Sequence, residues 1–464
     1  MDEETFLRDI RDEPDDIGPR LVFADWLEER GDQRAEFIRL DCELADPDLD
    51  SQSRAELHEV HQTLLREQRQ SCLKRLQALG VRDIRFWGGL VDRLLIEGTV
   101  FLDRPRTLFQ NAPVIRGLML RKIAPDVASE SMRRLFKLPQ LTCLTSLDVS
   151  GCGLAAGAAE ALAESDRSRR LSHLNVSHNF LGGQGLRNLA TSPHLCQLKR
   201  WNLAGNQLGV NDVRELTQSD ALRQLEDLLL SQNRLGDAGL RRLCQMPRLA
   251  RLRVLDVSRN DIGAEGLKSW AESSQLLDLV SLDLSGNPLG DIAGAVLAST
   301  SNANRLDDLN LANCHLGPEG CRAVLTSPHL QQLRALNLSR NGLGPGVLDP
   351  ASCRLPRLCA LELAYNQMES ADVVHLASST ALRLSRLDLS GNIVGDAGIQ
   401  SLMQWPVIDG LQVLRIANSG VSDDGVRMIL QSARFDHLAI LDLRDNPISL
   451  KPELIRRFSA RVQI

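Results

Sequence analysis

Short acidic runs are the first residues in this 464-residue chain that could bind a metal ion. Residues 46–50 read DPDLD, which spaces three carboxylates as the first part of a calcium-binding loop does. Such a loop also needs a glycine and, further on, a glutamate, and this chain has Ser51 and Leu57 at those two positions. We therefore expect a solvated loop and no metal site.

Four carboxylates near the N-terminus could be imagined as a general acid and base. Charges on the exposed faces of short helices explain their spacing equally well. The nine histidines form no H-x-x-x-H pair and lie near no C-x-x-C, and the glycines follow a repeated turn and not a phosphate-binding loop. We expect no enzyme activity, no catalytic residue and no cofactor. The four carboxylates are Asp25, Glu28, Glu29 and Glu36.

A third set of residues could bind a protein. Binding energy at protein interfaces concentrates in tryptophan, tyrosine and arginine, and the chain has a single tyrosine. The tyrosine and some of the arginines fall at outward positions of a repeated pattern and depart from its usual occupants, and two aspartates at such positions are added as candidates. The candidates are Asp256, Asp283, Arg340, Tyr365, Arg386, Arg415 and Arg444.

The elements that must position these residues come from the pattern L-x-x-L-x-L-x-x-N-x-L, which recurs twelve times. Successive copies lie 27 residues apart, apart from one gap of 25 and one of 26. A regular period of about 20 to 29 residues indicates a solenoid, in which each unit packs only on its neighbours. The asparagine position is occupied by Cys152, Asn179, Asn206, Asn233, Asn260, Asn287, Cys314, Asn341, Asn366, Asn392, Ser419 and Asn446.

Each unit is expected to consist of a strand, a turn, a helix and a loop that leads back to the next strand. In one unit, Leu228 and Leu230 lie two apart and so share one side of a strand. Leu240 and Leu243 then follow helical spacing, and Asp237 is placed to cap that helix. Because a helix separates consecutive strands, the strands must be parallel. The helices are wider than the strands, so we predict a right-handed β-α superhelix, a horseshoe with a concave parallel sheet.

The outward side of the predicted strands is acidic and rich in amides. Its middle position holds Asp148, Asn175, Asn202, Leu229, Asp256, Asp283, Asn310, Asn337, Glu362, Asp388, Arg415 and Asp442. Tyr365 lies beside Arg340 of the neighbouring unit, and Arg386, Arg415 and Arg444 form a diagonal. These residues could be a binding surface, or they could be ordinary exposed positions under weak constraint. The asparagines, in contrast, are expected to bond the backbone of their own turn and of the next one, which is a structural role.

The ends of the array lack the regular pattern. Residues 91–96 and 115–120 keep the strand spacing without the asparagine, as capping units do. Residues 452–458 predict a short helix and residues 461–464 a last strand. Between Asn341 and Asn366, the segment 344–350 (GPGVLDP) leaves little room for a helix.

The first 84 residues are predicted to be helical. Pro19 suits the first turn of a helix, Gly31 suits its C-terminal stop, and residues 53–56 (SRAE) form a capping box. This segment is also acidic, with 18 acidic against 6 basic side chains in residues 1–50. We expect a small helical cap on the first repeats.

Two stretches carry a family resemblance. The repeats resemble leucine-rich repeats of the ribonuclease-inhibitor-like class. Residues 19–32 (PRLVFADWLEERGD), with Arg34 and residues 36–40 (EFIRL), resemble the bacterial repeat-companion domain, a short module that precedes repeat arrays. Residues 87–93 (WGGLVDR) look like the start of the array in such proteins. The resemblance implies a bacterial, intracellular repeat protein, and it transfers no functional residue.

These observations predict an α/β leucine-rich-repeat solenoid preceded by a small all-α module. The module spans residues 1–84 and the solenoid residues 85–464, with irregular first units at 85–140, twelve regular repeats at 141–450 and a C-terminal cap at 451–464. The N-terminus has no signal-peptide pattern and no apolar run is long enough to span a membrane, so we expect a cytoplasmic protein. The ten cysteines form no disulfide framework, which fits a reducing compartment.

The function expected from the sequence is a non-enzymatic scaffold that binds a partner protein on the concave face. We expect a monomer that binds no nucleic acid, because the arginines are spread along the chain, and no membrane. An alternative is a regulator or adaptor that acts through the acidic N-terminal module, or through an exposed arginine on a partner nucleotide hydrolase. A third possibility is a purely structural array without a dedicated ligand.

Overall fold

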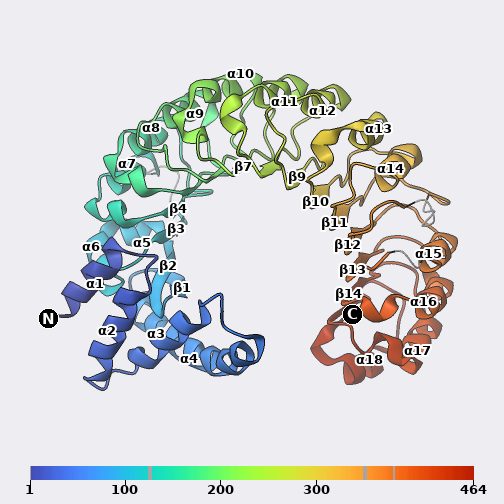
Figure 1. Ribbon diagram of the computed structural model, residues 1–464, viewed down its shortest axis with the longest axis horizontal. Helices are drawn as coiled ribbons and strands as arrows, with labels where there is room; N and C mark the ends of the chain where they lie inside the picture. Colours follow the sequence, from blue (N-terminus) through green and yellow to red (C-terminus); the bar gives the residue numbers. More distant parts are fainter. Residues whose placement is uncertain (1, 124–127, 348–352, 380–381) are drawn as a thin grey trace. The chain divides into compact units, whose positions relative to one another are not determined.

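The computed structural model describes residues 2–123, 128–347, 353–379 and 382–464. The chain forms two compact units. Unit 1 comprises Met1–Asn206 and Gln218–Leu225, and unit 2 comprises Gln207–Thr217 and Glu226–Ile464. Figure 1 labels the helices and strands of both units.

Unit 1 begins with four helices, α1 (Glu3–Asp12), α2 (Gly18–Glu28), α3 (Arg34–Leu44) and α4 (Ser51–Gln77). Pro19 lies in the first turn of α2, and Gly31 follows the end of that helix with a φ of 68°, as the sequence predicted. The capping box predicted at residues 53–56 is wrong. Asp50 caps α4 instead, because its carboxylate accepts hydrogen bonds from the backbone N–H groups of residues 52 and 53.

A β-hairpin follows these helices and was not predicted. Strand β1 (Val81–Trp87) pairs antiparallel with β2 (Leu90–Glu97), so the expectation of helix up to residue 84 is wrong over its last four residues. Gly88 and Gly89 connect the strands with φ values of 55° and 71°. Positive φ at both positions is typical of a two-residue hairpin turn of type I′, and glycine adopts this conformation without steric cost.

The rest of unit 1 is repetitive. Strand β3 (Gly117–Arg121) pairs parallel with β2, which confirms strands in both irregular first units. The regular repeats then add β4 (Ser146–Asp148), β5 (His173–Asn175) and β6 (Arg200–Asn202), each parallel to the one before. The helices between the strands are α5 (Gly98–Asp103), α6 (Pro105–Asn111), α7 (Ala128–Phe136), α8 (Ala156–Glu164) and α9 (Gly182–Ala190).

Unit 2 continues the same alternation with strands of two or three residues. Its strands are β7 (Asp227–Leu229), β8 (Val254–Asp256), β9 (Ser281–Asp283), β10 (Asp308–Asn310), β11 (Ala335–Asn337), β12 (Ala360–Glu362), β13 (Arg386–Asp388), β14 (Val413–Arg415), β15 (Ile440–Asp442) and β16 (Val462–Gln463). Every strand is parallel to its neighbour, with the middle leucines in register from β7 to β15. Period-2 alternation buries these leucines between sheet and helices.

The helices of unit 2 lie on the outer side of its arc and the strands on the inner side (Figure 1). The helices are α10 (Val210–Val213), α11 (Gly236–Cys244), α12 (Ala264–Ala271), α13 (Ile292–Ser299), α14 (Pro318–Leu325), α15 (Ser370–Ala377), α16 (Gly395–Gln404), α17 (Asp423–Gln431) and α18 (Lys451–Phe458). Helix α18 and strand β16 confirm the predicted C-terminal helix and strand. Residues 344–347 contain no helix, as predicted, and the remainder of that segment, 348–350, lies outside the described residues.

The asparagine ladder clasps each repeat to the one before it. The side-chain oxygen of Asn287 accepts from the N–H groups of Asn260 and Ile262, at 2.9 and 3.1 Å. Its nitrogen donates to the carbonyls of Val257 (3.0 Å) and, in its own turn, Leu284 (2.7 Å). The predicted bonds between each asparagine and its own turn are confirmed. The prediction that the remaining bonds go to the next repeat is wrong: they go to the preceding repeat, because the buried amide extends toward its N-terminal neighbour.

Aspartates at the start of the helices link each repeat to the following one, which is the opposite direction to the asparagine bonds. They were predicted to cap their own helices, which is wrong: each carboxylate accepts from a backbone N–H at the start of the following helix. Each repeat therefore holds both of its neighbours through main-chain groups. The donors are Gly263, Gly320, Ser422 and Ser449, and the acceptors are Asp237, Asp291, Asp396 and Asp423, at 2.6 to 2.9 Å.

Candidate functional site

The open face of unit 2 is the side of the sheet that the helices leave uncovered. The last residue of most of its strands is polar and has a structural task. An oxygen of Asp256 accepts from the N–H of Ser258 at 2.9 Å and from its hydroxyl at 2.7 Å. Asp283 accepts in the same way from the N–H of Ser285 at 2.8 Å. These turns explain why acids and amides occupy this position.

Burial and a neighbouring acid raise the pKa of two aspartates on this face. Asp256 and Asp283 are register partners on β8 and β9. Burial raises the pKa of Asp256 above its ordinary value, and the charge of Asp283 adds to this effect. Partial desolvation, together with the charges of Asp283 and Asp307, also raises the pKa of Asp308. The middle of the open face therefore carries negative charge that the protein itself does not fully compensate.

A shallow hollow of about 240 Å³ lies on strands β9 to β13. It brings together two of the predicted residues, Asp283 and Arg386, with Asp308 and Glu362. Arg386 is exposed at the start of β13 and makes no ion pair with any described residue. Three acids against one arginine give the lining of the hollow a net negative charge.

Arg340 and Tyr365 form a stack beside this hollow. The guanidinium carbon of Arg340 lies 4.2 Å from the centre of the Tyr365 ring, and the ring is 44% exposed. Both residues have a positive φ, 61° and 56°, which costs a non-glycine residue about 1 kcal/mol or more. The ring also lies over Gly391, where a Cβ would come within 2.3 Å of the ring carbon Cδ1. Glycine at residue 391 is therefore required for the position of the tyrosine ring.

The predicted arginine diagonal does not form one free cationic surface. Arg444 binds Asp442 through two hydrogen bonds, of 2.9 Å from Nε and 2.6 Å from Nη2. Burial favours the neutral acid at Asp442, but the bonds from Arg444 hold its pKa below the ordinary value. The guanidinium of Arg415 lies 3.9 Å from Asp388. Of the three arginines, only Arg386 faces the hollow.

Comparisons with known proteins agree with the repeat geometry. A family model for the Leucine Rich repeat matches residues 140–163, 167–190, 251–269, 277–298, 306–325 and 384–403. These segments carry the strand, turn and helix units described above. The chain folds as a leucine-rich-repeat solenoid. No curated protein matches the sequence.

Two solved structures resemble this leucine-rich-repeat solenoid. An internalin from Listeria monocytogenes has 19% sequence identity and a TM-score of 0.46, over 73% of this chain and 93% of that chain. A leucine-rich-repeat protein from Leptospira interrogans has 18% identity and a TM-score of 0.40, over 80% of this chain and 90% of that chain. At these TM-scores, neither likeness supports an inference about function.

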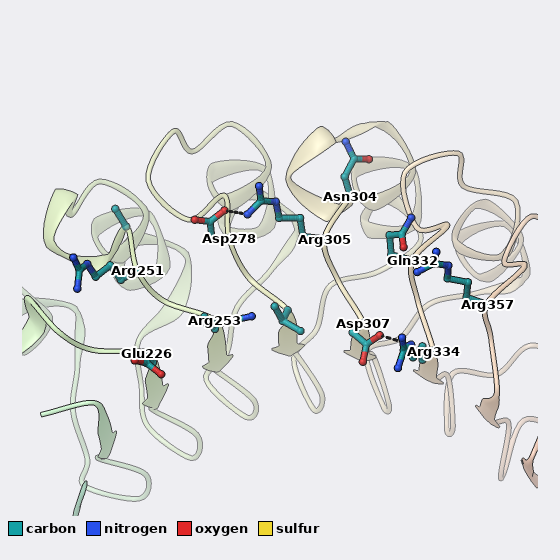
Figure 2. Close-up of a pocket in the computed structure, with 12 residues that line it drawn as sticks. Glu226, Arg251, Arg253, Asp278, Asn304, Arg305, Asp307, Gln332, Arg334 and Arg357 are labelled. Carbon is teal, nitrogen blue, oxygen red and sulfur yellow. Dashed lines mark hydrogen bonds and ion pairs between the residues drawn. The ribbon is translucent and has the colours of Figure 1, made fainter. Parts of the chain in front are cut away.

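The leucine-rich-repeat solenoid has a second polar surface that the sequence did not reveal. A groove of about 710 Å³ in unit 2 runs along the loops that lead into the strands, where Figure 2 shows two exposed ion pairs. Arg305 pairs with Asp278, and Arg334 pairs with Asp307 at 3.1 Å. The only sequence signal was the recurrence of charged residues just before the strands at the repeat spacing. The polar lining includes Glu226, Arg251, Arg253, Asp278, Asn304, Arg305, Asp307, Gln332, Arg334 and Arg357.

Asp25 and Glu28, two of the four N-terminal carboxylates, share one structural partner. Arg39 binds Asp25 at 2.6 Å and Glu28 at 2.5 Å, and its hydrogen bond to Glu28 lowers the pKa of Glu28, the reverse of what a general acid needs. Asp46 accepts from the N–H of residue 48. Within the described ranges, no cluster of histidine, cysteine and acidic residues could hold a metal ion, and no helix is long and apolar enough to cross a membrane.

Proposed function

We propose that the protein is a non-enzymatic scaffold that binds a partner protein on the concave open face of unit 2. The observation that carries this proposal is the stack of Arg340 and Tyr365. Both residues occupy the turn position that has a positive φ in all twelve regular repeats, from Gly151 to Asp445, so this conformation belongs to the repeat. What distinguishes the two residues is an exposed aromatic ring with an arginine stacked on it, a combination typical of anchors of protein interfaces.

The charge of the open face indicates what the partner contributes. The hollow next to the stack combines Asp283, Asp308 and Glu362, and the pKa of Asp308 is already raised. A lysine or arginine of the partner would neutralise these acids, while an apolar side chain would cover the ring of Tyr365. We therefore propose a partner segment with a basic residue next to an apolar one.

Affinity capture from a lysate of the native host, with the full chain as bait, tests this proposal. The bait variants are Tyr365→Ala and Arg340→Ala, with Arg322→Ala on the outer helix α14 as the matched control. We expect a partner that the wild type and the control retain and the two open-face variants lose. Equal retention by all four baits would contradict binding at the stack.

The single tyrosine allows a direct measurement on the same chain. Protein labelled with carbon-13 tyrosine gives one ring environment in the NMR spectrum, that of Tyr365. A captured partner added to this sample should shift or broaden that signal. An unchanged tyrosine signal at saturation would place the binding site elsewhere.

We also propose that residues 1–84 are a bacterial repeat-companion module that caps a ribonuclease-inhibitor-like array at 85–464, and that the protein is a cytoplasmic monomer. The contact of α3 with the hairpin in unit 1 supports a capping role. The N–H of Gly89 donates to Asp41 at 2.7 Å, and Asp41 also bonds His61 at 2.8 Å. Sedimentation of the full chain at several concentrations tests the monomeric state, which a concentration-dependent increase in mass would refute.

A further inference from the structure

Unit 1 contains a cleft of about 900 Å³ between its N-terminal helices and its first strands. Helices α1, α4 and α6, the β1–β2 hairpin and residue 140 all contribute to its walls. These segments are far apart in the sequence, so no local motif marks the cleft. Its volume is within the range of pockets that bind small molecules.

The floor of the cleft is apolar. Val91 and Val114 are each 8% exposed, and the half-buried ring of Phe109 lies beside them in the lining. An apolar ligand group would cover these side chains and displace water from them. Each square ångström of apolar surface buried in this way contributes about 25 cal/mol.

Three carboxylates line the cleft, Glu3, Glu4 and Asp32, but two of its arginines pair with none of them. Arg75 on α4 and Arg106 on α6 are exposed, and neither forms an ion pair with a described residue. Arg11 lines the same cleft but is bound to Glu4 at 2.5 Å, and Arg34 is bound to Asp32 at 2.8 Å. The two unpaired guanidinium groups are therefore the ones available to an anion.

The lining of the cleft also includes a buried hydrogen-bond acceptor. The side-chain oxygen of Gln140, which lines the cleft, is shielded from solvent and accepts no hydrogen bond from the protein. Leaving such a group without a partner is unfavourable. Rotation of this amide toward the cleft would let a ligand N–H or O–H group provide the missing donor.

We propose that this cleft binds a small organic anion. The ligand has an apolar body over Val91, Val114 and Phe109, an acidic group that Arg75 and Arg106 attract, and an N–H or O–H donor for Gln140. This site lies in unit 1, so it is independent of the partner surface proposed for unit 2.

A fluorescence titration of the full chain with 8-anilinonaphthalene-1-sulfonate tests the proposal, because this probe has apolar rings, one sulfonate and one N–H. The variants are Arg75→Gln/Arg106→Gln and Gln140→Leu. The matched control is Arg134→Gln/Arg170→Gln, which removes two exposed arginines of unit 1 outside the cleft. Circular dichroism verifies that every variant is folded.

We expect one saturable site in the wild type and in the control. The double arginine variant should raise Kd about tenfold, the effect of losing a hydrogen bond to a charged group, and Gln140→Leu should raise it less. Added salt should weaken binding to the wild type more than to the double arginine variant. Equal Kd values for all four proteins, or no saturable site in the wild type, would overturn the proposal.

Alkylation of Cys72 gives a second readout that does not depend on fluorescence. This half-buried thiol lines the cleft, and burial raises its pKa, so labelling with N-ethylmaleimide is followed at pH 9. Bound probe should slow labelling of Cys72 severalfold and leave that of Cys196, a half-buried thiol outside the cleft, unchanged. Equal slowing of both thiols, or of neither, would show that the probe binds elsewhere.

Discussion

Replacing Asn287 with alanine tests whether the ladder holds the repeats together. The side chain is 1% exposed and makes four hydrogen bonds, three of them to the preceding repeat. The alanine variant leaves two backbone N–H groups and two carbonyls without these partners. Of these four groups, the carbonyl of Leu284 keeps a partner, the thiol of Cys314 at 3.2 Å.

The expected loss follows from those four bonds. Each contributes a net stabilisation of about 1 kcal/mol, and an unsatisfied buried group costs about 1 to 3 kcal/mol. We expect Asn287→Ala to lower the free energy of unfolding of the surrounding repeats by about 4 kcal/mol. Asn287→Cys should lose roughly half as much, because the thiol of Cys314 at the equivalent position donates to the carbonyl of Leu284 at 3.2 Å.

Hydrogen exchange measured by mass spectrometry is the suitable assay, since a long repeat array need not unfold in one step. Protection of residues 257–262 and 284–289 reports on the two turns that Asn287 joins. Asn304→Ala, an exposed asparagine of unit 2, is the control and should change stability by less than about 0.5 kcal/mol. A loss below about 1 kcal/mol for Asn287→Ala would refute the reasoning, as would equal losses for alanine and cysteine.

Three further predictions follow from the contacts described above. Gly391→Ala should displace the ring of Tyr365, change its NMR signal and cost about 1 kcal/mol in backbone strain. The control is Gly420→Ala: Gly420 has a similar φ but no neighbour within 4 Å, so this variant should show the backbone strain alone. An unchanged tyrosine signal in Gly391→Ala would contradict the contact between the ring and Gly391. Asp256→Asn keeps the acceptor and removes the repelled charge. Because the folded pKa of Asp256 is raised, wild-type stability falls as pH rises through that pKa, and urea unfolding should find the variant about 0.5 kcal/mol more stable at pH 7 but not at pH 3. Gly89→Ala would place a Cβ 2.3 Å from the backbone of α3, so its melting temperature should fall by several degrees, and an unchanged value would contradict that docking contact.

The period of the sequence was sufficient to predict the strands and their register. Leu255, Leu282 and Leu309 recur at the same point of each unit, and the structure aligns them on adjacent parallel strands. A one-residue slip would turn such leucines toward solvent, so the pattern permits one register. The C-terminal helix and strand were predictable for the same reason, since they repeat the alternation once more.

Features outside the period could not be predicted. The β1–β2 hairpin has no second copy in the chain with which its pattern could be compared. The direction of the Asn287 and Asp237 bonds was also undetermined, because both neighbouring repeats offer the same backbone groups. The residues of the unit 1 cleft come from separate helices and loops, and only the fold brings Arg75, Arg106 and Gln140 to one cavity.

The two opposed clasps determine how such an array can change its length. An asparagine reaches back and an aspartate reaches forward, and both bind main-chain groups that every regular repeat offers. Excision of residues 260–286 would bring Asn287 into the place of Asn260, where it meets an equivalent turn on its N-terminal side. Whole 27-residue units can therefore be lost or duplicated with their junctions intact. The asparagine bonds also form across the spacings of 25 and 26 residues, where Asn366 and Asn392 accept from the preceding turns at 2.8 and 2.9 Å, so small changes in the length of a unit are tolerated as well.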